Sequence, residues 1–204
     1  MAVRRLSMLL VFIAAAVAQP NPASADVVAT IQSTTVEVGS MGFFDVFLTS
    51  DAAPGTPDLI GGYSVSINAI GGASFTGSVT PATTAANGYL FPGGFPQVDT
   101  SNPDLGYVDL LASGSTPVST GQVYGVGRVF YNAVTPGVYT VSWSADTSGF
   151  LHEDLTEIPA TFVNGTLTIT PATVPEPSSA LLLALTGIAG FGIRRRRASP
   201  SAAA

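Results

Sequence analysis

Hydrophobic and polar positions alternate with a period of two between residues 26 and 170, and turn residues interrupt the alternation. Tyr63–Ala69 and Tyr139–Ala145 alternate without a fault, and positions 44–49 follow the same rule. This period is typical of strands that bury one face and expose the other. Further strands are expected at Val27–Ile31, Thr35–Val38, Ser74–Val79, Tyr107–Leu111 and Gln122–Tyr131.

The last alternating run predicts a hairpin. Phe162–Ile169 carries Asn164-Gly165 in its middle, and this dipeptide favours a type I′ turn between two strands. About nine or ten strands then fall within residues 26–170. So many short strands indicate an all-β fold, a two-sheet antiparallel sandwich or jelly roll.

Two long segments without alternation are expected to be loops, Asp51–Leu59 and Pro81–Pro103. The second contains Tyr89, Phe91 and Phe95 around a Pro-Gly-Gly sequence. Aromatic residues on a long loop of a sandwich can form a contact surface for a ligand. They can also fold back onto the end of the sandwich as a lid, and this is the interpretation that we favour, with the contact surface as the alternative.

The composition and the charge narrow the possible chemistry. The 204 residues include no cysteine, which excludes a disulfide framework, a thiolate metal site and a cysteine nucleophile. Thirteen acidic residues lie between Asp26 and Glu176, where Arg128 is the only basic residue, so this stretch has a net charge of −12. Because phosphate contacts need clustered lysine or arginine, nucleic acid is excluded as a partner.

Residues 1–25 have the features of a secretory signal peptide. Arg4 and Arg5 precede the apolar run Met8–Ala18, and Ala23 and Ala25 form a small-x-small cleavage site. The apolar run would rise about 16 Å as a helix, roughly half of the hydrocarbon thickness of a bilayer. A cleaved signal for the Sec export machinery is therefore expected rather than a membrane span.

The C-terminus predicts a membrane anchor. A proline-rich linker over residues 171–179 leads to Ala180–Ile193, which has no charged residue. Four arginines follow it directly: Arg194, Arg195, Arg196 and Arg197. Such an order is typical of a stop-transfer sequence, although the run is shorter than the ~20 residues of most spans and would need arginine snorkelling. We expect a transmembrane helix with its arginines over residues 180–197 and a disordered cytoplasmic tail over residues 198–204.

Residues 174–197 resemble the PEP-CTERM protein-sorting domain. Val174, Pro175, Glu176 and Pro177 come first, then the apolar run, then the arginines. The resemblance implies recognition of this motif, and cleavage near it, by an exosortase, a membrane-embedded processing enzyme. It further implies a precursor held transiently in the inner membrane of a polysaccharide-exporting bacterium, and a mature form at the cell surface or outside the cell.

The middle of the chain resembles cohesin modules. The order of four patterns carries this resemblance: Val36–Gly39, Gly61–Ile67, Gly127–Tyr131 and Pro136–Tyr139. The resemblance implies a nine-stranded jelly-roll sandwich over residues 26–170 that binds a partner protein or packs into an extracellular matrix. Since the chain has no dockerin-like repeat, it implies a partner on another protein.

Few residues could support catalysis. His152 is the only histidine, and Glu153 and Asp154 lie beside it, but the chain has no Gly-x-Ser-x-Gly motif. We therefore expect no catalytic site and no bound cofactor. A structural calcium ion is the remaining alternative, because two acidic loops offer oxygen ligands: Asp99, Asn102 and Asp104, and Glu153, Asp154 and Glu157.

Three functions are compatible with these features. The first, which the lack of a catalytic constellation favours, is a non-catalytic protein of the cell surface or extracellular matrix. The second is a module that binds carbohydrate, such as extracellular polysaccharide, or a partner protein through a sheet face or the loop with Tyr89, Phe91 and Phe95. The third is a secreted hydrolase, which would need His152 or a carboxylate pair in a pocket.

Overall fold

The computed structural model describes residues 27–99, 104–144 and 146–173. Every regular element in these ranges is a β-strand, which confirms the prediction of an all-β fold. Within the same ranges, no helix is long and apolar enough to span a membrane.

One layer is a five-stranded sheet that we call the β3 sheet. Its order is β14 (Ala160–Val163), β1 (Val27–Ile31), β3 (Met41–Ser50), β10 (Tyr124–Ala133) and β6 (Ala73–Thr80). β3 pairs antiparallel with both of its neighbours, and β10 continues this pattern to β6.

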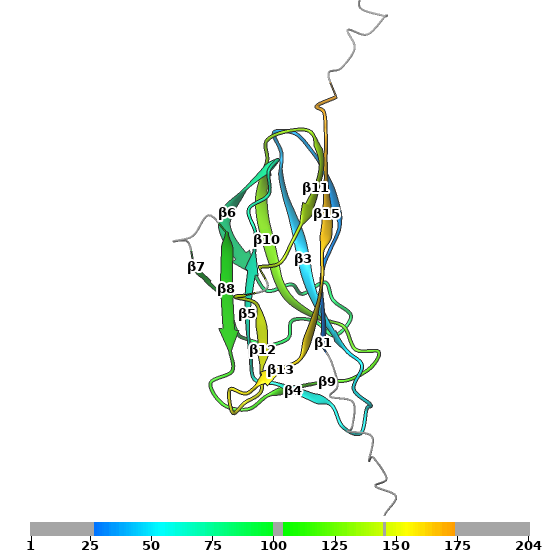
Figure 1. The fold of residues 1–204 in the computed structure, drawn as a ribbon, viewed down its shortest axis with the longest axis vertical. Helices are drawn as coiled ribbons and strands as arrows, with labels where there is room; N and C mark the ends of the chain where they lie inside the picture. Colours follow the sequence, from blue (N-terminus) through cyan, green and yellow to red (C-terminus); the bar gives the residue numbers. More distant parts are fainter. Residues whose placement is uncertain (1–26, 100–103, 145, 174–204) are drawn as a thin grey trace, which may run out of the picture.

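The other layer is a five-stranded sheet that we call the β5 sheet. Its order is β13 (Glu157–Ile158), β12 (Gly149–Leu151), β5 (Gly62–Ile67), β8 (Leu105–Leu110) and β7 (Gln97–Asp99). Figure 1 shows β8 and β5 on one side of the molecule and β3 and β1 on the other. Two smaller sheets complete the fold: β11 (Gly137–Val141) with β15 (Gly165–Thr170) and β2 (Thr34–Glu37), and β4 (Asp58–Ile60) with β9 (Thr116–Val118).

The two layers enclose a hydrophobic core. On β3, Phe44, Val46 and Leu48 point inward and are fully buried, as their alternation predicts. From the β5 sheet, Tyr63 and Tyr107 reach the same core. Truncating a buried side chain of this size costs about 3–5 kcal/mol, so these positions decide which face of each strand lies inside.

The predicted hairpin over Phe162–Ile169 is wrong. β14 and β15 follow one another along the chain, but they lie in different sheets. Gly165 is needed at the crossing, because a Cβ there would lie 2.8 Å from the carbonyl oxygen of Ile31. Instead of closing a turn, the Asn164 side chain accepts a hydrogen bond from the backbone N–H of Trp143 (3.4 Å).

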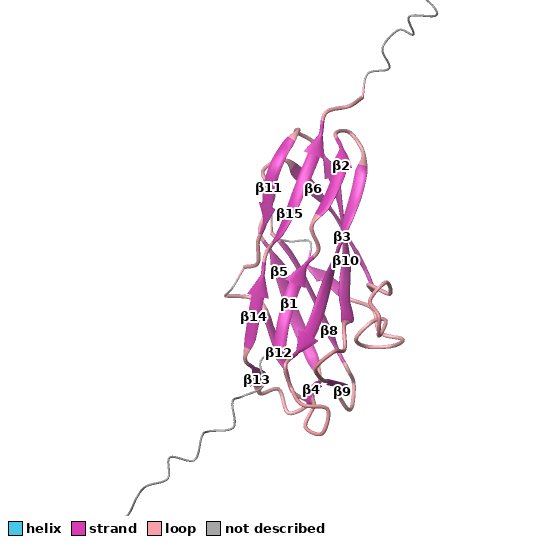
Figure 2. Ribbon diagram, turned by 90° about the vertical axis from the view of Figure 1, so that its right-hand side faces the viewer, coloured by secondary structure: helices cyan, strands magenta, loops and turns pink. Residues whose placement is uncertain are grey.

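The first and last strands of the domain run parallel. β1 pairs with β14 in one sheet, and β2 pairs with β15 in another (Figure 2). The first two strands therefore lie beside the last two and run in the same direction. As a result, Val27 lies toward one end of the long axis, and the chain leaves the domain after Thr173 at the other end (Figure 1).

Five of the strands were not expected from the pattern. β4, β7, β9, β12 and β13 have only two or three residues each, which is too short for a period to be detected. The run Tyr139–Ala145 is also shorter than predicted. β11 ends at Val141, and Trp143 makes only an isolated bridge to Ile67.

Candidate functional site

The outer face of the β5 sheet exposes hydrophobic side chains on a regular strand. On β8, Tyr107 and Asp109 point into the molecule, while Val108 and Leu110 point outward and are exposed. Two exposed hydrophobic side chains on the same face of one strand form a small apolar patch rather than isolated surface positions.

The neighbouring strand β5 surrounds these side chains with small residues. Leu110 lies across Gly62, because a Cβ at this glycine would be only 2.0 Å from the Cδ2 atom of Leu110. Leu151 of β12 pairs with Gly62 from the other side. We call this surface, made of Gly62, Ser64, Val108, Leu110 and Leu151, the β5 face.

A shallow hollow of about 190 Å³ lies beside the exposed valine of the β5 face. The Ser64 hydroxyl donates to the carbonyl oxygen of Thr147 (2.9 Å), and the Ser148 hydroxyl donates to that of Ser66 (3.2 Å). The protein itself engages these serine hydroxyls, which favours a partner that binds by apolar contact. The side chains at the mouth of the hollow come from three strands: Ser64, Ser66, Gln97, Asp99 and Val108.

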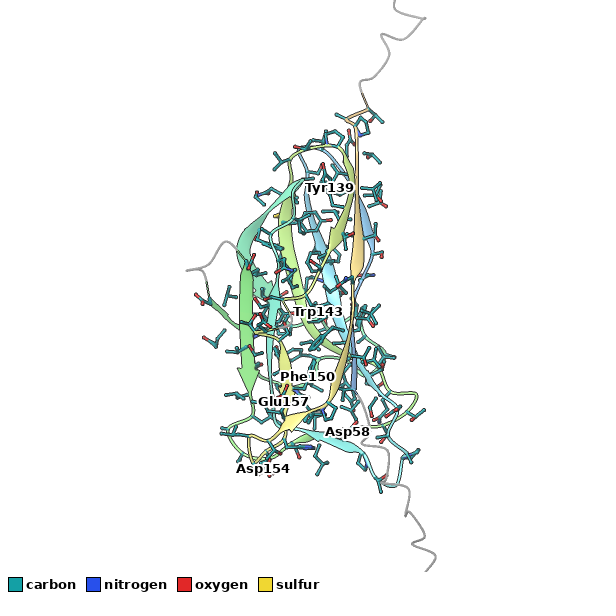
Figure 3. The ribbon with its side chains drawn as sticks, viewed as in Figure 1. Asp58, Tyr139, Trp143, Phe150, Asp154 and Glu157 are labelled. Atoms are coloured by element: carbon teal, nitrogen blue, oxygen red, sulfur yellow. The ribbon has the colours of Figure 1, made fainter. Side chains whose placement is uncertain are left out.

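Carboxylates flank the β5 face. Asp99 lies on the edge strand β7. Glu157, labelled in Figure 3, lies on the opposite edge strand β13. The described residues include eleven acids and one arginine, Arg128, and that arginine is paired with Asp45 on the other sheet. A partner of this face would therefore gain from basic residues around its own apolar contact.

A buried hydrogen-bond network supports the β5 face from below. The hydroxyl groups of Tyr63 and Tyr89 lie 2.8 Å apart, and the Tyr63 hydroxyl also contacts the carbonyl oxygen of Val126 at 2.9 Å. Tyr89 in turn donates to the carboxylate of Asp109. Burial is the main cause that raises the pKa of both phenols far above the ordinary value of 10.0, so both remain protonated. Because Asp109 lies between Val108 and Leu110 on β8, the network fixes the strand that presents them.

The aromatic loop residues separate into two groups. Tyr89 and Phe91 are buried, and the Phe91 ring stacks on Tyr63 with a centroid distance of 5.6 Å. Phe95 is 69% exposed beside a hollow of about 390 Å³. The structure thus brings Tyr89 and Phe91 together in the core and leaves Phe95 as the loop aromatic that a ligand could reach.

The outer face of the β3 sheet holds the paired arginine. Arg128 Nε lies 2.7 Å from Asp45 Oδ1, and Arg128 Nη2 lies 2.8 Å from Asp45 Oδ2. The Thr84 hydroxyl donates to the same carboxylate (2.5 Å), and the guanidinium stacks 4.0 Å from the ring centroid of Phe43. The hydrogen bond to Asp45 is the main cause that raises the pKa of Arg128. This cluster pins the Thr84 loop to the sheet, so its first role is structural.

His152 lies on the loop between β12 and β13, next to Glu153 and Asp154. Its Nδ1 atom is 3.1 Å from the carbonyl oxygen of Leu59, a backbone contact rather than a contact with a serine hydroxyl. The Thr156 hydroxyl is the main cause that lowers the pKa of the exposed Asp154 carboxylate. Across the three described ranges, no three His, Asp or Glu side chains are grouped so that they could hold a metal ion.

The terminal candidates lie outside the described residues. They are the signal cleavage residues Ala23 and Ala25, the motif Val174–Pro177 and the stop-transfer arginines Arg194–Arg197. Asn102, offered above as a calcium ligand, lies outside them as well.

Residues 173–197 match the family model described as the PEP-CTERM protein-sorting motif. The chain carries a PEP-CTERM sorting motif. The match begins where the described part of the domain ends, so the motif follows the sandwich with almost no spacer. A search among curated proteins finds no match to the chain.

The domain that precedes the PEP-CTERM motif has the fold of cohesins. The seventh ScaB type I cohesin of Pseudobacteroides cellulosolvens superimposes with a TM-score of 0.55 at 14% identity, covering 74% of this chain and 96% of that one. A non-cellulosomal cohesin from the hyperthermophilic archaeon Archaeoglobus fulgidus gives 0.54 at 10% identity, with coverages of 76% and 95%. A chain of a type I cohesin–dockerin complex from Clostridium thermocellum gives 0.52 at 11% identity, with coverages of 72% and 95%. These likenesses confirm the cohesin-like β-sandwich.

Sequence reasoning did not single out Val108 and Leu110. The run Tyr107–Leu111 was expected to be a strand, but an aspartate normally marks the solvent side of an alternating run. Asp109 points inward because Tyr89 donates to it, and this reverses the expected orientation. The sequence did hold one signal for the inward orientation of Asp109. Tyr107, two positions earlier, lies on the same face of the strand, and a large aromatic residue there favours that face as the buried one.

Proposed function

We propose that this chain is an exported protein that an exosortase sorts and cleaves at its C-terminal motif. The observation that carries the proposal is the match of residues 173–197 to the PEP-CTERM sorting motif. In this proposal residues 180–193 hold the precursor in the inner membrane, and cleavage near Pro175–Pro177 releases the sandwich to the cell surface or the surrounding polysaccharide matrix.

The sorting proposal is tested by intact mass and by cell fraction in a host that has the processing enzyme. The wild-type protein is expected outside the inner membrane with a mass that corresponds to cleavage near Pro175–Pro177 and therefore lacks residues 180–204. The double variant Pro175→Ala/Pro177→Ala should accumulate in the membrane at the mass of the uncleaved chain. Pro171→Ala, in the same linker but outside the matched residues, is the control and should be processed normally. Normal processing of the double variant would contradict the proposal.

We further propose that the sandwich is a non-catalytic module that binds a partner protein through the β5 face. Three exposed or half-exposed hydrophobic side chains there lie among glycine and serine on a rigid sheet, and carboxylates flank them. The cohesin–dockerin complex among the similar structures shows that this fold can form protein complexes. The expected partner has an apolar centre and a basic rim.

A photo-crosslinking amino acid at two matched positions tests the partner proposal. Val108 on the β5 face is 40% exposed, and Val163 on the outer face of the β3 sheet is 41% exposed. Crosslinking in the native host should trap one defined protein from position 108, and Leu110→Glu in the same chain should abolish the product. Equal crosslinking from both positions, or a product insensitive to Leu110→Glu, would contradict the use of this face.

A further inference from the structure

The end of the domain from which the chain continues toward residue 174 differs from the rest of the surface. Three connections meet there, residues 38–40, 68–72 and 134–136, together with the end of β15 and residues 171–173 (Figure 1). We call this end of the molecule, with the adjoining strand ends, the C-terminal pole.

Backbone hydrogen bonds make the C-terminal pole a single rigid unit. Gly39 N–H donates to the carbonyl oxygen of Ala133 (2.8 Å), and Val38 N–H donates to that of Thr170 (2.9 Å). The Tyr139 side chain packs over the 68–72 connection and donates to the carbonyl oxygen of Thr135, and it is labelled near this end in Figure 3. Side chains presented by these turns are therefore held in fixed positions.

The C-terminal pole exposes hydrophobic side chains from three elements. Met41 begins β3, Val134 lies in the turn after β10, and Val138 lies on β11, and all three are well over half exposed. Two carboxylates adjoin this end: Glu37 accepts a hydrogen bond from the backbone N–H of Thr173 (2.7 Å), and Asp104 accepts one from the backbone N–H of Ala69 in the 68–72 connection (3.0 Å). Both carboxylates are engaged by backbone N–H groups, and the most exposed side chains of this end, Met41, Val134 and Val138, are apolar.

The opposite end of the molecule has the reverse character. Figure 3 shows Asp58, Asp154 and Glu157 near that end. Two more acidic residues lie on connections at this end: Asp51 directly follows β3, and Glu153 lies just after β12. Negative charge is therefore concentrated away from the C-terminal pole.

The sequence limits how far the C-terminal pole can lie from the apolar run. Only six residues separate Thr173 from Ala180. A fully extended chain advances about 3.3–3.6 Å per residue, so these seven steps span roughly 25 Å at most. If residues 180–193 are inserted in a bilayer, this end of the sandwich is kept close to the lipid headgroups.

We propose that the C-terminal pole rests on the lipid bilayer while the chain is tethered, with Met41, Val134 and Val138 in contact with the headgroup region. The proposal rests on the membrane tether proposed above. Exposed apolar side chains gain free energy at a lipid interface, and an anionic leaflet repels the opposite end, where more of the carboxylates lie. Together these effects hold the long axis of the sandwich upright and direct the β5 face sideways, where a partner can reach it.

Spin labels at two matched positions test this orientation. The chain has no cysteine, so each single-cysteine variant carries one label. Val138 is 72% exposed at the C-terminal pole, and Leu155 is 68% exposed on the loop between β12 and β13 at the other end. The full chain is reconstituted in phosphatidylethanolamine–phosphatidylglycerol vesicles, and label relaxation is measured with oxygen, which enters lipid, and with a water-soluble nickel chelate. Relaxation by oxygen relative to nickel should be several-fold higher in Val138→Cys than in Leu155→Cys.

The outcomes separate this proposal from the tether itself. Flotation of the vesicles after an alkaline wash reports whether the chain is inserted, and loss of the protein from the vesicles would overturn both proposals. If the chain floats but residue 138 is as accessible to nickel as residue 155, the tether stands and the lipid contact is wrong. A third outcome is spin–spin broadening at residue 138 that disappears when the labelled protein is diluted with unlabelled protein. It would assign this end to contacts between copies of the chain and would also overturn the lipid proposal.

Discussion

The buried tyrosine hydroxyl groups differ in whether they have a hydrogen-bond partner. The Tyr63 hydroxyl bonds to Tyr89 and to a backbone carbonyl, and through Tyr89 it supports the strand that carries Val108 and Leu110. The Tyr107 hydroxyl is equally buried, but it has no hydrogen-bond partner within the described part of the chain. A buried polar group without a partner costs free energy, whereas a bonded one contributes a modest amount.

Replacing each tyrosine by phenylalanine should show this difference. Tyr63→Phe is expected to lower the free energy of unfolding by about 1–2 kcal/mol, because it removes two hydrogen bonds. Tyr107→Phe should leave the free energy of unfolding unchanged or raise it slightly, since the lost hydroxyl has no partner. Urea unfolding followed by tryptophan fluorescence measures both, and an equal loss in the two variants would contradict the network.

The single arginine of the described residues supports a second prediction. Arg128→Gln leaves the buried Asp45 carboxylate with only the Thr84 hydroxyl, so we expect a loss of roughly 2–3 kcal/mol in the free energy of unfolding. Arg128→Lys keeps the charge but loses the two-pronged contact, and should fall between wild type and Arg128→Gln. A glutamine variant as stable as wild type would show that the pair contributes nothing.

At the scale of elements, the sequence predicted long strands well and their partners poorly. The alternation over Val27–Ile31 and Ser74–Val79 identified strands that the structure contains, because each buries one face. The hairpin predicted from Asn164-Gly165 was wrong, because this dipeptide fits both a turn and a crossing between sheets. The contact of Gly165 with the Ile31 backbone, which is distant in the sequence, decides between the two. The β5 face was missed for a related reason, since the orientation of β8 depends on Tyr89 in a loop far along the chain.

The docking of the aromatic loop on β10 depends on one glycine. Leu90 N–H donates to the carbonyl oxygen of Gly125, and Gly125 N–H donates to that of Gly88, both at 2.8 Å. A Cβ at Gly125 would lie 1.7 Å from the carbonyl oxygen of Ala82, which is rigid backbone. Gly125→Ala should therefore destabilise the domain by at least about 3 kcal/mol. Gly55→Ala, where a Cβ meets nothing within 4 Å, is the control in the same thermal unfolding measurement and should change little.

For the whole molecule, the buried phenols limit how far the pH can rise before the folded state loses stability. Burial is the first cause that raises the pKa values of Tyr63, Tyr89 and Tyr107 above 10.0 in the folded protein. Above pH 10 the unfolded chain releases these protons and the folded protein retains them. The free energy of unfolding is therefore unaffected by them below that pH and decreases as the pH rises further.

Each of these tyrosines should lower the free energy of unfolding by up to about 1.4 kcal/mol per pH unit above pH 10. Urea unfolding between pH 8 and pH 11.5, with absorbance at 295 nm as the record of ionisation, measures this slope. Tyr107→Phe removes one phenol at little cost in stability and should make the slope shallower by one tyrosine. A stability independent of pH up to 11.5 would contradict the burial of the phenols.

The parallel pairing of the terminal strands has a mechanical consequence. If a bound partner pulls on the sandwich while the membrane tether holds residue 173, tension enters through the end of β15 and runs along the strand axes. The bonds joining β15 to β2, and β14 to β1, lie across this direction, so they must rupture together rather than open one after another. We expect stretching from residue 27 to residue 173 in an optical trap to require a higher rupture force than stretching across the sandwich from residue 108 on the β5 sheet to residue 163 on the β3 sheet. The strand order that joins the two ends of the domain would thus make a tethered sandwich resistant to load.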